Sequence, residues 1–136
     1  MNTDLVIQFP AILIKEESLI VERTLEGLTT CSKAALGNRF FDNALLLGCN
    51  GKAQVIISAT KLKGIGLFLG YDLFLNQRIR VALAVKNDAF DFTMEYLRAK
   101  VGSVLRRRRS GAYSEIIASI ESAENFSEIV SILENL

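Results

Sequence analysis

"ALLLGCNGKAQVIISA" (Ala44–Ala59) joins two apolar runs through the dipeptide Asn50-Gly51. An Asn-Gly pair between such runs is typical of a type I′ turn, because both residues tolerate positive φ angles. The stretch therefore predicts a β-hairpin, and we expect the fold to be built around an antiparallel sheet.

The segment that follows, Lys61–Asn87, predicts a second pair of antiparallel strands. Its part "RIRVALAV" alternates apolar side chains with arginine and alanine, which is the period-two pattern of a half-buried strand. We expect the turn of this pair near Asn76-Gln77. The two pairs would then form four strands that follow one another in sequence.

Upstream of the hairpin, "DLVIQFPAILI" (Asp4–Ile14) predicts an extended, buried strand that joins the sheet. Pro10 marks an edge, a bulge or a bend there, because proline cannot donate a hydrogen bond to a neighbouring strand. After a polar turn, "SLIVE" (Ser18–Glu22) is either a second strand or the approach to a helix.

Two helices are predicted, one before and one after the central strands. Over 24–36, apolar and small residues recur at helical spacing, and Gly37 follows them as at a helix C-terminus. Over 88–109 a second apolar stripe recurs at steps of three and four, and Asp88 or Asp91 is the expected N-cap. This stripe consists of Phe90, Met94, Leu97, Val101 and Val104 or Leu105.

The C-terminal tail contains a near repeat, "YSEIIASIES" (113–122) and "FSEIVSILEN" (126–135), with an offset of 13 residues. In one straight helix this offset would turn the second apolar stripe by about 220°. We therefore expect two short helices with a break near Glu124-Asn125, in which Ser114 and Ser127 are the N-cap candidates. A single bent or continuous helix is the alternative.

These elements make up one α+β domain over residues 1–136. We expect an antiparallel meander of four to five strands, with a helix before it, a long helix after it and two short C-terminal helices. The helices at 24–36 and 88–109 would cover one face of the sheet. The acidic tail 110–136 would belong to the same domain or dock on a partner subunit.

The composition is unusually apolar, with 50% hydrophobic residues and a mean hydropathy of +0.29. The longest apolar stretch, Gly64–Leu75, is shorter than the roughly 20 residues of a membrane span, and the first residues lack the basic region of a signal peptide. We therefore expect a cytoplasmic protein that buries its apolar surface in a homodimer interface. Cys31 and Cys49 match no CxxC spacing, and we expect them to be reduced and buried.

The sequence contains no histidine, which excludes Ser-His and Cys-His nucleophile systems and HExxH metal sites. "CNGKA" lacks the serine or threonine of a P-loop, and the pairs Ser58/Lys61 and Tyr96/Lys100 lack the partner motifs of the enzymes that use them. Asp88, Asp91 and Glu95 are read as acids of a first helical turn. We expect no cofactor and no metal, and an enzyme is not favoured.

Charge is distributed unevenly along the chain. Residues 52–109 carry twelve basic and four acidic groups, net +8, whereas residues 110–136 carry five acidic groups and no basic ones, net −5. The arginines 106–109 wrap around a helix at about 100° per residue, so they cannot all face one partner. We expect them to meet water and the glutamates of the tail, and we expect the tail to dock mainly through Ile116, Ile120, Ile129, Val130 and Leu133.

Three functions remain open. The favoured one is a non-enzymatic binding or regulatory module that acts as a homodimer. The first alternative is a nucleic-acid-associated protein, in which Tyr96 offers a stacking face and phosphates contact Arg78, Arg80, Arg98, Lys100, Arg106, Arg107 and Arg109. The second alternative is a small-ligand binder or enzyme with a pocket on the sheet, built from Arg78, Arg80, Tyr71 or Asp72.

Overall fold

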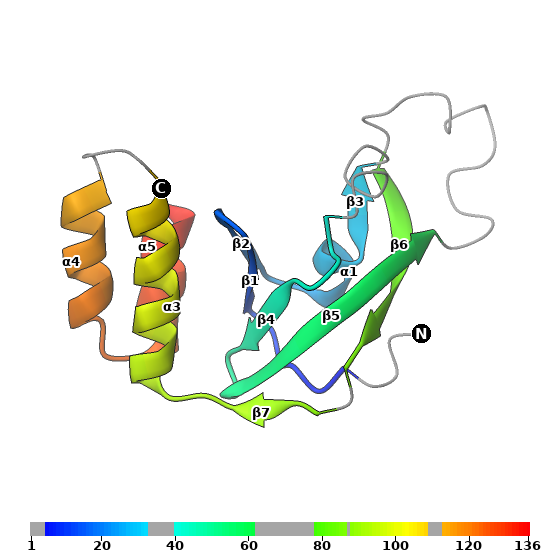
Figure 1. The fold of residues 1–136 in the computed structure, drawn as a ribbon, viewed down its shortest axis with the longest axis horizontal. Coiled ribbons are helices and arrows are strands. Elements are labelled where there is room, and N and C mark those ends of the chain that lie inside the picture. Colours follow the sequence, from blue (N-terminus) through cyan, green and yellow to red (C-terminus); the bar gives the residue numbers. More distant parts are fainter. Residues whose placement is uncertain (1–4, 33–39, 62–77, 87, 109–112) are drawn as a thin grey trace.

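The computed structural model describes residues 5–32, 40–61, 78–86, 88–108 and 113–136. Figure 1 shows a sheet with a layer of helices beside it. The described elements are β1 (Ala11–Lys15), β2 (Ser18–Glu22), α1 (Leu25–Leu28), β3 (Thr30–Ser32), β4 (Leu45–Gly48), β5 (Lys52–Lys61), β6 (Arg78–Val85), β7 (Phe90–Asp91), α3 (Met94–Arg107), α4 (Ser114–Ser122) and α5 (Phe126–Glu134).

The strands form an antiparallel sheet in the order β2-β1-β4-β5-β6-β3, and β7 pairs with the start of β5. This confirms the predicted α+β class, with an antiparallel sheet and helices after it. Ser18–Glu22 is a strand, and its partner β1 lies inside the sheet between β2 and β4. Pro10 directly precedes β1.

The hairpin at Asn50-Gly51 is confirmed, although its turn differs from the predicted type. Leu47 of β4 pairs with Ala53 of β5. The strand β4 ends at Gly48 and β5 begins at Lys52, so three residues make the loop. The Gly51 N–H donates to the Gly48 carbonyl at 3.1 Å, and of the three loop residues only Gly51 has a positive φ, +80°. This is the three-residue loop in which the last position is left-handed, and not a type I′ turn.

The predicted pairing within Lys61–Asn87 is wrong. The strand β6 pairs directly with β5, with Leu83 opposite Ala59, and on its other side with β3, with Arg80 opposite Thr30. The expected turn at Asn76-Gln77 lies outside the described residues.

The first predicted helix is much shorter than 24–36. The side chain of Thr24 accepts a hydrogen bond from the Gly27 N–H at 3.0 Å and starts α1, which ends at Leu28. The chain then enters β3, which pairs with β6. The residues at this change are threonines, whose branched side chains favour extended backbone.

The second predicted helix starts later than expected. Thr93, not Asp88 or Asp91, is the N-cap of α3, and its hydroxyl accepts from the Tyr96 N–H at 3.1 Å. Before it, Phe90 and Asp91 form β7 and lie opposite Ala53 and Lys52 of β5.

Two hydrophobic cores lie on opposite faces of the sheet. Ala11 and Leu13 of β1 belong to the first core, together with Leu28 of α1. Ile12 and Ile14 belong to the second core, which the helices α3, α4 and α5 complete. The prediction that α1 and α3 cover the same face is therefore wrong.

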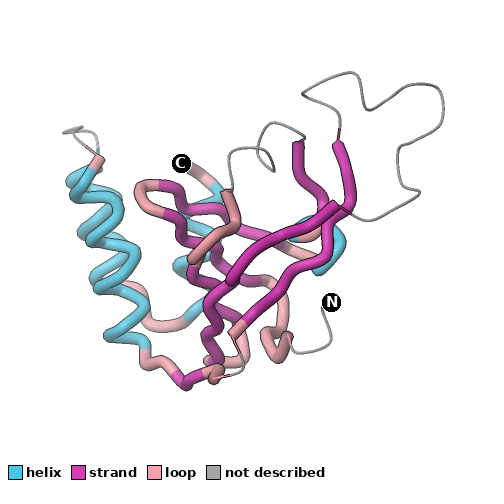
Figure 2. The backbone as a smooth tube through the Cα atoms, turned by 45° about the vertical axis from the view of Figure 1, so that its right-hand side comes forward, coloured by secondary structure: helices cyan, strands magenta, loops and turns pink. Residues whose placement is uncertain are grey.

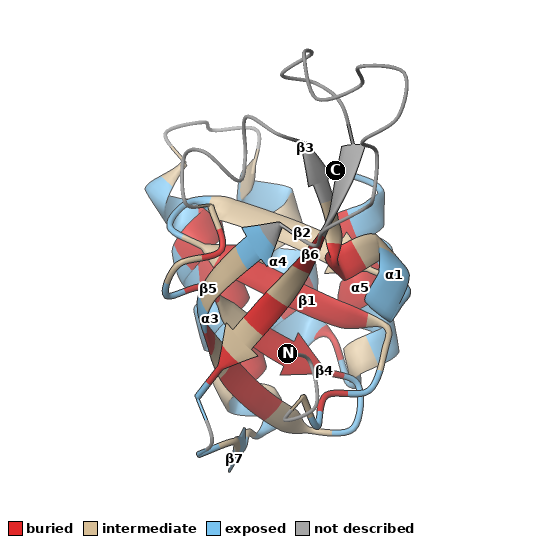
Figure 3. Ribbon diagram, turned by 90° about the vertical axis from the view of Figure 1, so that its right-hand side faces the viewer, coloured by how far each residue is buried: buried red, intermediate tan, exposed pale blue. Residues whose placement is uncertain are grey.

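Figure 2 shows the helices α3–α5 on one side of the strands, and Figure 3 shows that β1 is buried while its neighbour β2 is only intermediate.

Leucine-to-alanine substitutions test the two cores with one chemical change. Leu13→Ala opens a cavity in the first core and Leu47→Ala in the second, because both side chains are fully buried. Each should lower the free energy of unfolding by about 2–5 kcal/mol. The matched control Leu25→Ala, at an exposed leucine of α1, should change it by less than about 0.5 kcal/mol. Urea denaturation measures all three, and a loss at only one of the two core positions would contradict a sheet buried on both faces.

Candidate functional site

The seven basic residues proposed from the sequence do not form one surface. Arg98, Lys100, Arg106 and Arg107 lie on α3. Arg78 and Arg80 begin β6, which pairs there with β3 at the far end of the sheet from α3 (Figure 1). Arg109 lies outside the described residues.

Several cations of α3 and its C-cap have partners within the chain. Arg106 pairs with Glu121 of α4 at 2.6 Å. The Nε of Arg98 donates to the Ala123 carbonyl at 2.7 Å, and the Nε of Arg108 donates to the Glu17 carbonyl at 2.8 Å. These bonds tie α3 to α4 and to the β1–β2 turn, so these guanidinium groups serve the fold.

The tail forms two helices, as predicted, with the break at Ala123–Asn125. Asn125, not Ser127, caps α5, and its Oδ1 accepts from the Glu128 N–H at 2.9 Å. The Glu128 carboxylate accepts from the Glu124 N–H at 2.8 Å, which resembles a capping box. The other predicted cap is also wrong, because Tyr113 precedes α4 without a side-chain cap bond.

The prediction that glutamates of the tail meet the arginine run is confirmed for one pair. Glu121 binds Arg106, whereas Glu134 binds Arg23, which follows β2. The Nε of Arg23 donates to Glu134 at 2.8 Å. This hydrogen bond, helped by the attraction of the carboxylate, raises the pKa of the Arg23 guanidinium above its usual value.

Three cations of α3, Arg98, Lys100 and Arg107, have no acidic partner among the described residues. Arg98 and Arg107 donate to backbone carbonyls, those of Ala123 in the loop after α4 and of Ser103 in α3 itself. The Nζ of Lys100 lies over the face of Tyr96, 5.6 Å from the ring centroid. Tyr96 also lies against Phe90 of β7, with ring centroids 5.9 Å apart. The structure therefore places the exposed ring of Phe90 and the half-buried ring of Tyr96 at the start of the helix face that carries Lys100 and Arg107.

Sequence reasoning found Tyr96 but missed Phe90. It placed Phe90 in the apolar stripe of a helix, whereas Phe90 lies on β7 and is 39% exposed. The order Phe90-Asp91-Phe92 alternates with period two, which is the signal of a short strand. That signal was hidden by the helical spacing of the residues that follow.

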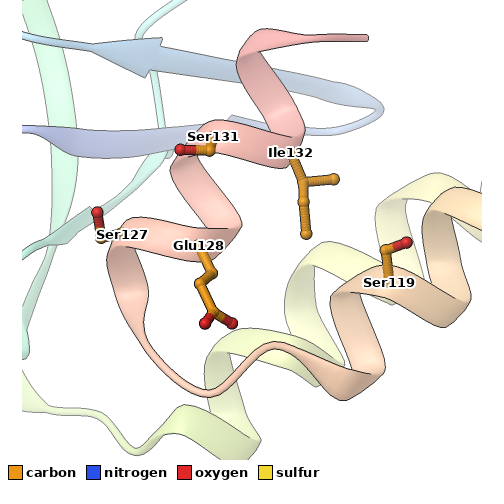
Figure 4. A pocket seen from close by; sticks show the side chains of 5 residues that line it. All are labelled: Ser119, Ser127, Glu128, Ser131 and Ile132. Atoms are coloured by element: carbon orange, nitrogen blue, oxygen red, sulfur yellow. The ribbon is translucent and has the colours of Figure 1, made fainter.

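The pocket proposed on the sheet stays a prediction, because two of its four residues are not among the described residues. Tyr71 and Asp72 lie outside them. Figure 4 shows a different hollow, of about 400 Å³, between α4 and α5. Its lining consists of Ser119, Ser127, Glu128, Ser131 and Ile132. It is wide open, and its single charged group is Glu128, whose carboxylate already accepts a backbone hydrogen bond.

The described residues contain neither a cluster of metal ligands nor a membrane-spanning helix. No three Cys, Asp or Glu side chains of the described ranges converge as metal ligands. No described helix is both long enough and apolar enough to span a bilayer.

Cys49 is a free thiol at the surface, so the expectation that it is buried is wrong, and Cys31 lies in β3.

Comparison with protein-family models, with curated proteins and with solved structures finds no match to this chain. Function must therefore be argued from the surfaces described above.

Apolar packing, and not the ion pairs, should hold the tail on the sheet. Ile129 is fully buried in the second core, so Ile129→Ala should lower the free energy of unfolding by about 2–5 kcal/mol. Glu121 and Arg106 are 57% and 56% exposed, so Glu121→Gln should lower it by less than about 1 kcal/mol. Urea denaturation compares the two, and a larger loss for Glu121→Gln would show that charge pairing dominates.

Proposed function

We propose that the protein is a non-enzymatic binding or regulatory module that acts as a homodimer. The observation that carries this proposal is an uncovered part of the sheet. The helices α3, α4 and α5 pack on the face formed by β2, β1, β4 and the start of β5, and none of the β6 side chains whose burial is described, 81–85, belongs to their core. The rest of that face, on β5 and β6, has no cover among the described residues.

The uncovered face carries small and weakly polar side chains. On β6, Ala82 and Ala84 alternate with the buried residues of the first core and lie opposite Thr60 and Ser58 of β5. A β-bulge between Ile56 and Ser58 leaves Ile57 outside both cores and 47% exposed. Small side chains around one large apolar side chain allow two sheets to approach closely, which suits a self-complementary contact.

A second copy of the chain is the occupant that fits the composition. Half of the residues are hydrophobic, and a chain of this length has a limited interior in which to bury them. In a two-fold symmetric dimer the same patch serves both subunits, so Ile57 of each chain meets the small residues of the other. The proposal places the protein in the cytoplasm, where the exposed Cys49 thiol stays reduced.

The mass in solution tests the dimer. Each chain has a mass of 15.0 kDa, and light scattering at micromolar concentration should report about twice that value for the wild type. Ile57→Lys should yield a folded monomer, because a lysine would have to bury its charge at the contact. The matched control Leu136→Lys, at an equally exposed apolar side chain, should remain a dimer.

Circular dichroism and thermal unfolding establish that both variants are folded. A monomeric wild type, or a dimer that survives Ile57→Lys, would contradict the proposed contact.

A further inference from the structure

An aromatic surface lies where β7 meets the start of α3, away from the uncovered face of β5 and β6. Phe90 projects from β7 with 39% of its surface exposed, and the ring of Tyr96 lies edge-on to it at 5.9 Å and 82°. Phe92, which contacts Tyr96 and Phe126, belongs to the border of the second core. The exposed ring therefore rests on a packed aromatic base and is held in place.

A line of hydrophilic side chains continues from this surface along α3. Tyr96, Lys100, Ser103 and Arg107 follow one another at steps of four, three and four, which places them on one face of the helix. Lys100 and Arg107 are exposed and, among the described residues, have no acidic partner. Seven residues of helix separate these two charges by about 10 Å.

Among the described residues, the acidic groups nearest in sequence, Asp88, Asp91 and Glu95, form no ion pair with Lys100 or Arg107. Asp91 is paired with Lys52 at 2.5 Å, and Glu95 lies about 100° around the helix from Tyr96. The other described cations of α3, Arg98 and Arg106, are bound to α4. The positive charge that α4 does not bind therefore lies on the helix face that begins at Tyr96, with Lys100 next to its ring.

We propose that this surface, defined by Phe90, Tyr96, Lys100 and Arg107, binds single-stranded nucleic acid. Exposed aromatic rings stack on unpaired bases, and cations beside them contact the phosphates. A duplex keeps its base faces inside the stack, so it would leave Phe90 without a contact. The surface uses residues apart from the dimer contact, so each proposal can fail without the other.

Fluorescence anisotropy with a labelled oligothymidylate tests the proposal on the full-length protein. Phe90→Leu keeps an apolar side chain but removes the ring, and it should weaken binding about five-fold or more. Phe90→Tyr keeps the ring and should bind like the wild type. Both variants change an exposed side chain, and their circular dichroism should match that of the wild type.

The charges are tested by two double variants with the same change in net charge. Lys100→Gln with Arg107→Gln should weaken binding about ten-fold and lower the slope of log affinity against log salt by about 1.4, because two phosphate contacts are lost. Arg23→Gln with Arg106→Gln removes two cations that are already paired with glutamates, and it should change affinity by less than about two-fold.

Three results would overturn the proposal. The first is no binding of the oligothymidylate at about 20 mM salt, where phosphate contacts are strongest. The second is equal binding of duplex DNA or heparin with no effect of Phe90→Leu, which would indicate a general polyanion surface. The third is equal weakening by the two double variants, which would indicate net charge alone.

Discussion

The fold depends on one strand that is buried on both of its faces. Four consecutive residues of β1, Ala11–Ile14, are 0%, 0%, 1% and 8% exposed. Because neighbouring side chains of a strand point to opposite faces, such a run requires cover on both sides of the sheet. The helices α3–α5 cover one face, and α1 packs with residues of β5 and β6 on the other. The acidic tail is therefore part of the core, and its glutamates lie at the rim.

Local sequence patterns predicted the elements better than their partners. The alternation in Arg78–Val85 and the near repeat in the tail each depend on a single element, and both predictions were confirmed. The neighbours of β6 depend on contacts across a long connection, about which the periodicity of one strand says nothing. The helix predicted over 24–36 was wrong for a related reason. Its helical spacing competes with the preference of two threonines for extended backbone, and the chain there enters β3, which pairs with β6.

The partners of the charged residues could also be predicted only in part. The geometry of a helix was enough to predict that the arginine run would diverge and that part of it would meet the tail, as Arg106 and Glu121 do. It could not predict that Arg23 meets Glu134, because those residues are brought together only when α5 packs beside β2. The candidate surface at Phe90 was missed because its character comes from the pairing of β7 with β5. Lys100 and Arg107 are the cations of α3 that the contacts with α4 do not use, and only the tertiary structure shows this.

Native-state amide hydrogen exchange tests the two-sided burial of β1 most directly. If β1 joins the two cores into one cooperative unit, its amides and those of β4 exchange only when the whole domain unfolds. Their free energies of opening then equal the free energy of global unfolding from urea denaturation. Exchange of the Ile12, Leu13 and Ile14 amides at a clearly lower free energy, while the amides of β6 remain protected, would show that one core opens without the other and would contradict this account.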